Sequence, residues 1–326
     1  MKKMRTKVAA RIVGGALLAL ASLWAFSTAY AEYPDKPIKL IIPYPPGGST
    51  DIAARIIISA APMHLPQPFV IQNIGGAGGS IGTNEAAKAK PDGYTLIIGA
   101  NATNTYIPLS QKVPYDRDSF IPIAQITASP TIMAVQGSSP YKTIHDLIEK
   151  AKKEPNTLKY STAGVYSAHH VPTVLFSQKT GIKMKHIPYA GGAQAMTALL
   201  GGHVDLNPNY PSPLSSGIRA GTIRPLAVTS GDRIKAYPDL PTLKELGIDV
   251  VVEQWQAVLA PKGTPEPIVK ALREAFKKIC SDALYITMLE KMGEEVKYVD
   301  GTEFGKFWEK NWKDTQDLFA SGVMTN

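Results

Sequence analysis

The stretch Ile38–Ile58 reads IKLIIPYPPGGSTDIAARIII and combines the patterns of a strand, a turn and a helix. Its first part, Lys39–Ile42, is rich in β-branched residues and bounded by proline, which predicts a buried strand. Prolines and two glycines then turn the chain, and Ser49 or Thr50 can cap a helix that Pro62 ends. The first N–H groups of that helix have no intrahelical partners, so the turn can bind a carboxylate or another anion. A turn whose glycines serve geometry alone explains the same pattern.

The first 31 residues have the pattern of a secretory signal peptide. Five basic residues and no acid precede Glu32, an apolar run follows at Ala16–Phe26, and Ala29–Ala31 forms an A-x-A cleavage site. The apolar run is shorter than the roughly 20 residues that span a bilayer. We therefore expect export to the periplasm through a cleaved signal peptide, with a mature protein that begins at Glu32.

Charge and cysteine content exclude several classes of function. Removal of the signal peptide lowers the formal net charge from +8 to +3, and no block of lysine and arginine remains, so we expect no nucleic-acid partner. Cys280 is the single cysteine, which excludes an internal disulfide and any two-cysteine redox or zinc motif. The remaining 295 of the 326 residues are enough for two domains of roughly 150 residues, and we expect a monomer.

Strands and helices alternate after the opening unit. Strands are expected at Phe69–Gln72 and Tyr94–Ile98, with a glycine loop and the helix Thr83–Lys90 between them and the polar loop Gly99–Asn104 after them. This order predicts an α/β domain with a parallel sheet. In such sheets ligands bind beyond the carboxyl ends of the strands, where Gly47 and Gly48 are also expected.

A second α/β unit follows from residue 128. Its expected strands are Thr131–Val135, Leu158–Ser161, Lys185–Pro188, Val204–Leu206 and Ile223–Thr229, and its expected helices are Ile144–Lys152, Ala168–Gln178 and Ala193–Leu200. A strand at Trp255–Pro261 and helices at Ile268–Ile279, 282–292 and 302–319 complete the chain.

This layout predicts two lobes joined by a two-strand hinge. Lobe 1 is expected to comprise residues 32–127 and 254–326, and lobe 2 residues 128–253. The chain should pass between them near Ile126–Ile132 and again near Val252–Trp255. A ligand cleft is expected between the lobes.

The sequence matches the motifs of known enzyme classes only weakly. Gly78–Gly82 matches the G-x-S-x-G elbow of serine hydrolases, but the elbow needs a strand that runs directly into the serine, and here the strand ends near Gln72. A secreted serine hydrolase that uses Ser80 stays an alternative to a non-catalytic protein. The dinucleotide and phosphate-loop patterns are absent, and the histidines lack metal-ligand spacing, so no cofactor and no metal are expected.

The turns expected at the cleft contain no lysine or arginine. They are Gly47–Asp51, Asn101–Asn104, Thr162–Ser167 and Tyr189–Gly192. An anion there would be held by backbone N–H groups, hydroxyls and helix N-termini rather than by a salt bridge. Within or beside these turns, Tyr44, Asn101, Ser167 and Tyr189 are candidate ligand-binding residues. His169 and His170 begin a helix, where a neutral, satisfied histidine and a ligand contact both fit the pattern.

Eight blocks, in this order along nearly the whole mature chain, resemble the periplasmic solute receptors of the tripartite tricarboxylate transporter type, often called Bug receptors. The blocks are Tyr33–Ile38, Pro45–Asp51, Gly76–Gly82, Pro91–Leu96, His186–Tyr189, Gly201–Asp205, Pro238–Thr242 and Gly263–Pro265. The resemblance implies a type II periplasmic-binding fold that closes on its ligand about a hinge, and ligands that are mostly small carboxylates, with some neutral or aromatic compounds.

The resemblance also implies site residues. The first turn would bind the ligand carboxylate, partly through ordered water, and a serine/threonine turn, a helix-start histidine and an acid would come from the second lobe. These roles map to Gly47, Gly48 and Ser49, to Thr162, Ala163 and Gly164, to His170 and to Asp205.

The chain departs from the family pattern at three places that bear on the identity of the ligand. Ala190 stands where the family usually has lysine, Tyr166 replaces a small residue, and Asn207–Pro213 replaces a more apolar stretch. We expect a receptor that captures a small organic acid and passes it to membrane transporter subunits or to a sensor. The residues leave open whether transport or signalling is its main task.

Overall fold

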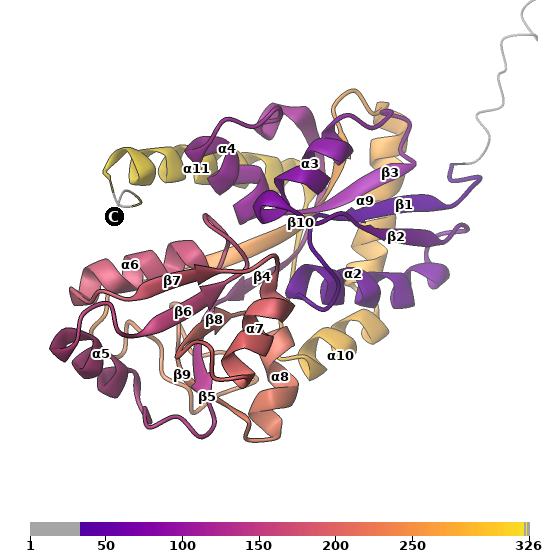
Figure 1. Cartoon of the computed structure of the whole chain (residues 1–326). Helices are drawn as coiled ribbons and strands as arrows, with labels where there is room; N and C mark the ends of the chain where they lie inside the picture. The colour runs from indigo at the N-terminus through magenta and orange to yellow at the C-terminus, as the bar shows by residue number, and fades with distance from the viewer. Residues whose placement is uncertain (1–32, 323, 325–326) are drawn as a thin grey trace, which may run out of the picture. The chain divides into compact units, whose positions relative to one another are not determined.

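A computed structural model of the chain describes residues 33–322 and 324 (Figure 1), so the predicted signal peptide and its cleavage site lie outside the described residues. The contacts divide the chain after Asp35, and the helices and strands of the described residues all belong to the unit Lys36–Asn326.

The larger sheet is mixed. Its strands are β1 (Ile38–Ile42), β2 (Phe69–Asn73), β3 (Thr95–Ala100), β4 (Phe120–Pro130), β10 (Glu253–Pro261) and β11 (Val296–Asp300), in the order β11–β4–β10–β3–β1–β2. β1 runs parallel to β2 and β3, with Leu40 beside Ile71 on one side and Leu96 on the other. β10 is antiparallel to both β3 and β4, and β11 is antiparallel to β4. The parallel sheet predicted from the sequence is therefore only its first half, because β10 enters the sheet from the other end of the chain.

Helices cover both faces of this sheet. They are α2 (Ser49–Ala60), α3 (Ser80–Ala87), α4 (Ile107–Ser110), α9 (Glu266–Cys280), α10 (Ala283–Lys291) and α11 (Gly301–Ala320). On one face Trp255 of β10 packs edge-on against Phe304 and Trp308 of α11, in a cluster that also includes Ala86 of α3. On the other face Phe69 of β2 packs against Phe276 of α9. Figure 1 shows α2 and α10 close together, and they are in contact.

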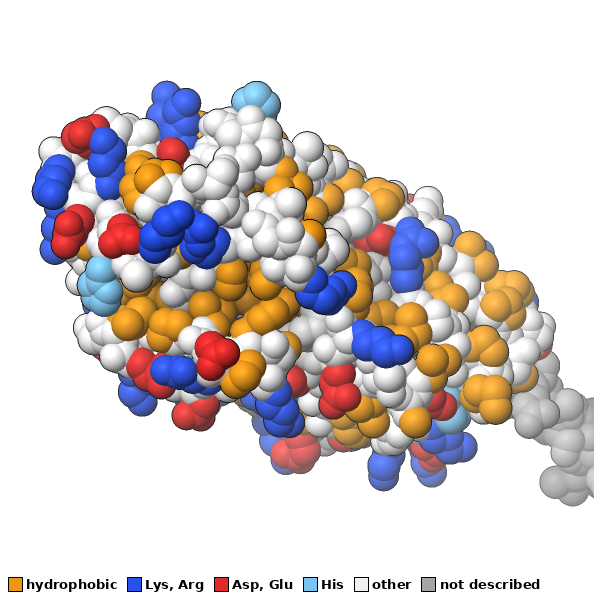
Figure 2. All heavy atoms as spheres, turned by 90° about the horizontal axis from the view of Figure 1, so that it is seen from below, with side chains coloured by type: hydrophobic (Ala, Val, Ile, Leu, Met, Phe, Trp, Pro, Cys, Tyr) orange, Lys and Arg blue, Asp and Glu red, His pale blue; other side chains and the backbone are white. Residues whose placement is uncertain are grey.

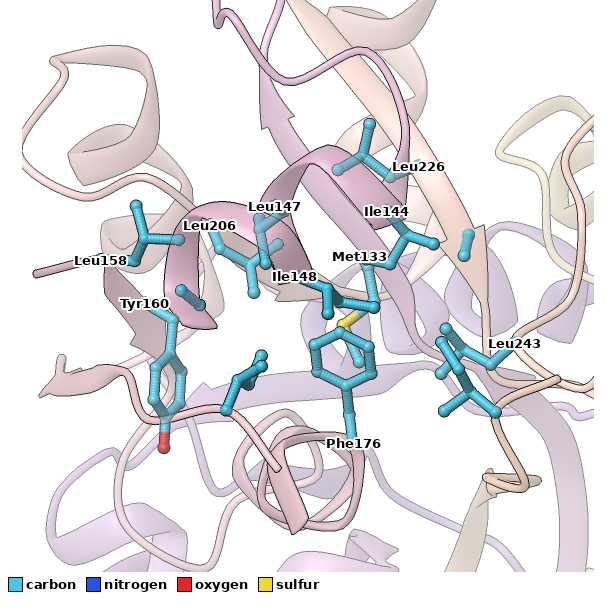
Figure 3. Packing of buried hydrophobic residues seen from close by; sticks show 14 of the residues in the cluster. Met133, Ile144, Leu147, Ile148, Leu158, Tyr160, Phe176, Leu206, Leu226 and Leu243 are labelled. Atoms are coloured by element: carbon cyan, nitrogen blue, oxygen red, sulfur yellow. The ribbon is translucent and has the colours of Figure 1, made fainter. Parts of the chain in front are cut away.

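Residues 131–252 form the second part of the fold. A three-stranded antiparallel sheet contains β5 (Ile132–Gln136), β8 (Asn207–Asn209) and β9 (Ile223–Val228), and a parallel pair contains β6 (Lys159–Thr162) and β7 (Lys185–Pro188). The helices are α5 (Ile144–Lys153), α6 (His170–Thr180), α7 (Gly192–Leu200) and α8 (Pro211–Arg219). Figure 3 shows Met133 of β5, Ile148 of α5 and Phe176 of α6 converging in one buried cluster. This part therefore has a hydrophobic core of its own.

The chain passes between the two parts twice, at adjacent positions. β4 ends at Pro130 and β5 begins at Ile132, and the return occurs between Val252 and β10. The buried hydroxyl of Thr229 accepts a hydrogen bond from the Thr131 N–H (2.9 Å) and donates one to the Val252 carbonyl (2.7 Å). A single side chain thus ties both crossings together.

Several elements differ from the sequence predictions. The polar loop expected at Gly99–Asn104 is the end of β3 followed by a π-helical turn (Ala102–Tyr106) that leads into α4. The helix expected at Thr83–Lys90 begins earlier, at Ser80. β11 and α8 were not predicted. Within the described part of the chain, no helix has the length and apolarity needed to span a bilayer. On the face in Figure 2, acidic and basic side chains are intermixed.

Candidate functional site

The turn between β1 and α2 is held by an internal carboxylate. Asp51 accepts hydrogen bonds from the Gly47 N–H (3.0 Å), from Asn73 Nδ2 (3.0 Å) and from the Arg55 guanidinium (2.9 and 3.1 Å). Burial raises the pKa of Asp51, but the hydrogen bonds from Arg55, Gly47 and Asn73 outweigh it and leave the pKa below its usual value. The Gly47 N–H therefore donates to Asp51 within the protein and is not free to bind an external anion.

The two glycines of this turn have different roles. Gly47 has φ +88°, a conformation that favours glycine. Gly48 has φ −82° and ψ 170° and is the N-cap of α2, so the cap predicted at Ser49 or Thr50 lies one or two residues earlier. No side chain caps this helix. The first N–H groups of α2 are therefore not capped by a side chain, and this end of the helix carries a partial positive charge.

A small cavity lies against this helix end. Its volume is about 30 Å³, enough for one or two water molecules. It is lined by Tyr44, Gly48, Ser49, Thr50 and Ala100 on the side of the larger sheet, and by Ala163, Ser167, Ala168, His169, Gly192 and Tyr210 on the other side. None of these described lining residues carries a formal charge at neutral pH, since burial lowers the pKa of His169 to about 4.

The two sides of the cavity are in close contact. A Cβ atom added to Gly48 would lie 4.0 Å from the backbone nitrogen of Gly192, and one added to Gly47 would lie 3.4 Å from the Cβ of Ala193. Gly192 is the first residue of α7, which likewise has no side-chain cap. Two uncapped helix N-termini thus lie at one small cavity whose two sides touch, an arrangement that we describe as closed.

A larger hollow of about 530 Å³ has a different character. It is lined by Lys142–His145, Pro225, Leu226, Ala236–Pro241 and Leu246. The helix that begins there, α5, is already capped, because Thr143 accepts from the Asp146 N–H while the Asp146 carboxylate accepts from the Lys142 and Thr143 N–H groups. Its N-terminal donors are in use, so the smaller cavity is the better anion site despite its size.

The family model described as "Tripartite tricarboxylate transporter family receptor" matches residues 53–320. The chain belongs to this receptor family. The family inferred from the sequence blocks is thereby confirmed.

Relatives of this receptor agree with the assignment. BugT from Bordetella pertussis is 37% identical over 245 residues, which cover 74% of this chain and 75% of BugT. A solved structure of a protein from R. palustris with adipate is 30% identical, with a TM-score of 0.85 over 90% of this chain and 99% of that one. MatC from Rhodopseudomonas palustris with bound malate is 27% identical, with a TM-score of 0.83 over 90% of this chain and 100% of MatC. The two-lobed periplasmic-binding-protein fold predicted from the sequence is confirmed.

Five of the residues predicted to bind the ligand line the cavity of this receptor, and the other seven do not. Lining residues are Tyr44, Gly48, Ser49, Ala163 and Ser167. Thr162 ends β6, and Gly47, Gly164 and Tyr189 belong to the surrounding turns; none of the four lines the cavity. Asn101 is buried at the start of the π-helical turn, where its Oδ1 accepts from the Trp255 N–H (3.0 Å). The Asp205 carboxylate accepts from the Lys159 N–H (2.8 Å), at the opposite end of β6 from the cavity.

His170 lies in a stack of rings behind the cavity wall. Its Nδ1 accepts from the Tyr166 N–H (3.2 Å), and its ring stacks on His186 with 4.2 Å between centroids. The Nε2 of His186 in turn contacts the Thr162 hydroxyl (2.6 Å). Burial lowers the pKa of His186 to about 4, and burial together with the neighbouring His186 lowers the pKa of His170 to about 3. The stack is therefore neutral near pH 7 and supports the Thr162–Ser167 turn.

Six residues that line the cavity were not among the predicted ligand-binding residues: Thr50, Ala100, Ala168, His169, Gly192 and Tyr210. His169 and His170 are adjacent, and only the fold decides which of them faces the cavity. Tyr210 precedes Pro211 at the first position of α8, a helix-start signal that could have placed it at a helix N-terminus like the other cavity residues.

Proposed function

We propose that this receptor closes its two lobes on a small organic carboxylate in the periplasm and passes it to the membrane subunits of a tripartite tricarboxylate transporter. The observation that carries the proposal is the small cavity at which α2 and α7, one from each lobe, present uncapped N-termini. The N–H groups and dipoles of both helices favour an anion. The malate and adipate in the solved relatives are carboxylates of the expected class.

Binding requires the lobes to open and close. A cavity of about 30 Å³ cannot admit an organic acid while closed. We propose lobe 1 as residues 32–127 and 254–326 and lobe 2 as residues 128–253, with the crossings at Thr131 and Val252 as the hinge. A ligand that bridges α2 and α7 would stabilise the closed state, since it contacts both N-termini only there.

Calorimetric titration with malate, succinate and adipate tests the proposal. At a ligand concentration 100-fold above Kd, binding should add about 2.7 kcal/mol to the free energy of unfolding. Succinamide, the neutral analogue of succinate, is the control, because it lacks the charge that the helix ends attract. If succinamide bound as tightly as succinate, or if no acid bound, the proposed carboxylate site would be wrong.

We propose a non-catalytic protein, and the position of Ser80 supports this. Ser80 begins α3 after a glycine in the left-handed region (Gly79, φ +102°), rather than following a strand directly. Among the hydrogen bonds of residues 33–322, none joins Ser80 to a histidine. A serine-directed covalent inhibitor should leave Ser80 unlabelled, and stoichiometric labelling at Ser80 would favour the hydrolase alternative.

Export and delivery complete the proposal. N-terminal sequencing of periplasmic material should begin at Glu32, and sequencing that returned Met1 would contradict a cleaved signal peptide. Uptake of the bound acid should be lost in cells that lack this receptor. Normal uptake together with a lost transcriptional response would indicate a signalling role instead.

A further inference from the structure

His169, a residue of the cavity wall, has a buried ring nitrogen without a hydrogen-bond partner in the part of the chain that the structure describes. His169 is 4% exposed, and within the described residues its Nδ1 has no partner. Two polar side chains close to it are hydrogen-bonded: the Ser167 hydroxyl accepts from the His170 N–H (3.3 Å), and Asn209 Nδ2 donates to the Gly192 carbonyl (3.3 Å). A buried polar atom without a partner costs free energy, which a ligand that supplies the partner would recover.

His169 stands directly over the start of α7. Its Cε1 atom lies 3.2 Å from the position that a Cβ atom on Gly192 would take, and its ring packs edge-on against Tyr210 with 5.3 Å between centroids. A carboxylate held by the N–H groups of α7 would therefore have the imidazole beside it.

We propose that His169 is a specificity-determining residue that selects 2-hydroxy acids, pairing with the hydroxyl group on the carbon next to the carboxylate. This inference rests on the proposed carboxylate site. A hydroxyl group both donates and accepts, so it can pair with Nδ1 in either imidazole tautomer. An acid with a methylene group at the same place leaves Nδ1 unpaired, and sites built to pair with a hydroxyl discriminate strongly against analogues that lack it.

The same cavity disfavours 2-amino acids. An ammonium group is charged and needs an acidic partner when it is removed from water. The described lining residues include no aspartate or glutamate, and His169 is neutral because burial holds its pKa near 4. A neutral hydroxyl group fits this environment better than an ammonium group does.

Matched ligand pairs test the proposal by calorimetry at pH 7. The pairs are L- or D-malate against succinate, and lactate against propionate, which differ only by the hydroxyl group. The wild-type receptor should bind the better hydroxy acid of at least one pair roughly tenfold or more tightly than its unsubstituted partner.

Three variants separate the role of His169 from an effect on folding. His169→Leu replaces the imidazole with an apolar side chain of similar size and breaks no hydrogen bond that the described residues make at Nδ1. It should abolish the discrimination while the unsubstituted acid still binds. His169→Asn places an amide group near the position of Nδ1 and should restore part of it. His203→Asn changes an exposed histidine and should keep the wild-type ratio.

The outcomes distinguish this inference from the proposed function. If acids bind but the hydroxyl group gives no advantage, or if the advantage survives in His169→Leu, the role of His169 is wrong and the carboxylate site stands. If no acid binds the wild-type protein, both are wrong.

Discussion

Two buried histidines and one partly buried histidine should make stability depend on pH. In the unfolded chain His169, His170 and His186 take up protons near pH 6.5, whereas in the folded protein burial lowers their pKa values to about 4, 3 and 4. Between these values the unfolded state binds more protons, so the free energy of unfolding should fall as the pH decreases from about 6.5 to about 4. The expected slope is up to about 1.4 kcal/mol per pH unit for each histidine. Urea titrations across this range measure it. His169→Asn should lower the slope by the share of one histidine, and a flat profile in the wild type would contradict the prediction.

Substitutions at Gly47 and Gly48 should have different effects, one on the stability of the protein and the other on its affinity for the ligand. Gly48 has φ −82°, so valine fits its backbone, but the added methyl groups would enter the space before Gly192 N, 4.0 Å from the new Cβ. We expect Gly48→Val to weaken binding of the best acid at least ~10-fold, or about 1.4 kcal/mol, with little loss of stability. Gly47→Ala is the matched change, and it should lower stability by about 1 kcal/mol because φ is +88° there. Calorimetry and denaturant titration on both variants measure the two effects. Wild-type affinity in Gly48→Val would place the anion on another turn.

At the scale of elements, α8 is anchored by a buried acid from the other part of the fold. α8 begins Pro211-Ser212-Pro213, and since proline has no N–H, Ser212 supplies the one backbone donor of these three residues. Both its N–H (3.1 Å) and its hydroxyl (2.6 Å) donate to Glu294, which also accepts from Ser129 of β4. Burial raises the pKa of Glu294, against the effect of these hydrogen bonds. The acid therefore joins α8 to the strand that leads to the hinge.

Removal of one hydrogen bond to Glu294 should lower the free energy of unfolding. We expect Ser212→Ala to lower the free energy of unfolding by about 1–3 kcal/mol, because it takes a donor from a buried carboxyl group. Ser216→Ala is the control on the same helix, since Ser216 is exposed, and it should cost no more than about 0.5 kcal/mol. Denaturant titration compares the two variants. Equal effects would show that Glu294 does not anchor α8.

Local patterns predicted most elements but not all of their partners. β1, α2 and α9 were visible because β-branched runs, turn residues and amphipathic spacing agree with the observed structure. The antiparallel direction of β10 could not be predicted. β10 is far in sequence from its partner β3, and their pairing depends on where the chain re-enters the larger sheet after the second lobe. The candidate site was likewise predicted only where local sequence determines it. The β1–α2 turn was found from its own residues, whereas the use of the Gly47 N–H by Asp51 and the orientation of His169 depend on contacts that only the fold creates.

For the whole molecule, ligand binding should be seen as compaction. The closed cavity of about 30 Å³ admits no organic acid, so the unliganded receptor must populate an open state from which binding begins. Thr229 ties both crossings with one hydroxyl group, so we expect the motion to be a rotation about this pair of strands rather than a separation of the lobes. Small-angle scattering should give a smaller radius of gyration with saturating acid than without it. The closed value should approach about 19 Å, as expected for a folded chain of the mature length. At an acid concentration near the wild-type Kd, Gly48→Val should stay nearer the unliganded value than the wild type does, because it binds the acid at least ~10-fold more weakly. A wild-type radius that is the same with and without saturating acid would mean that binding does not close the lobes.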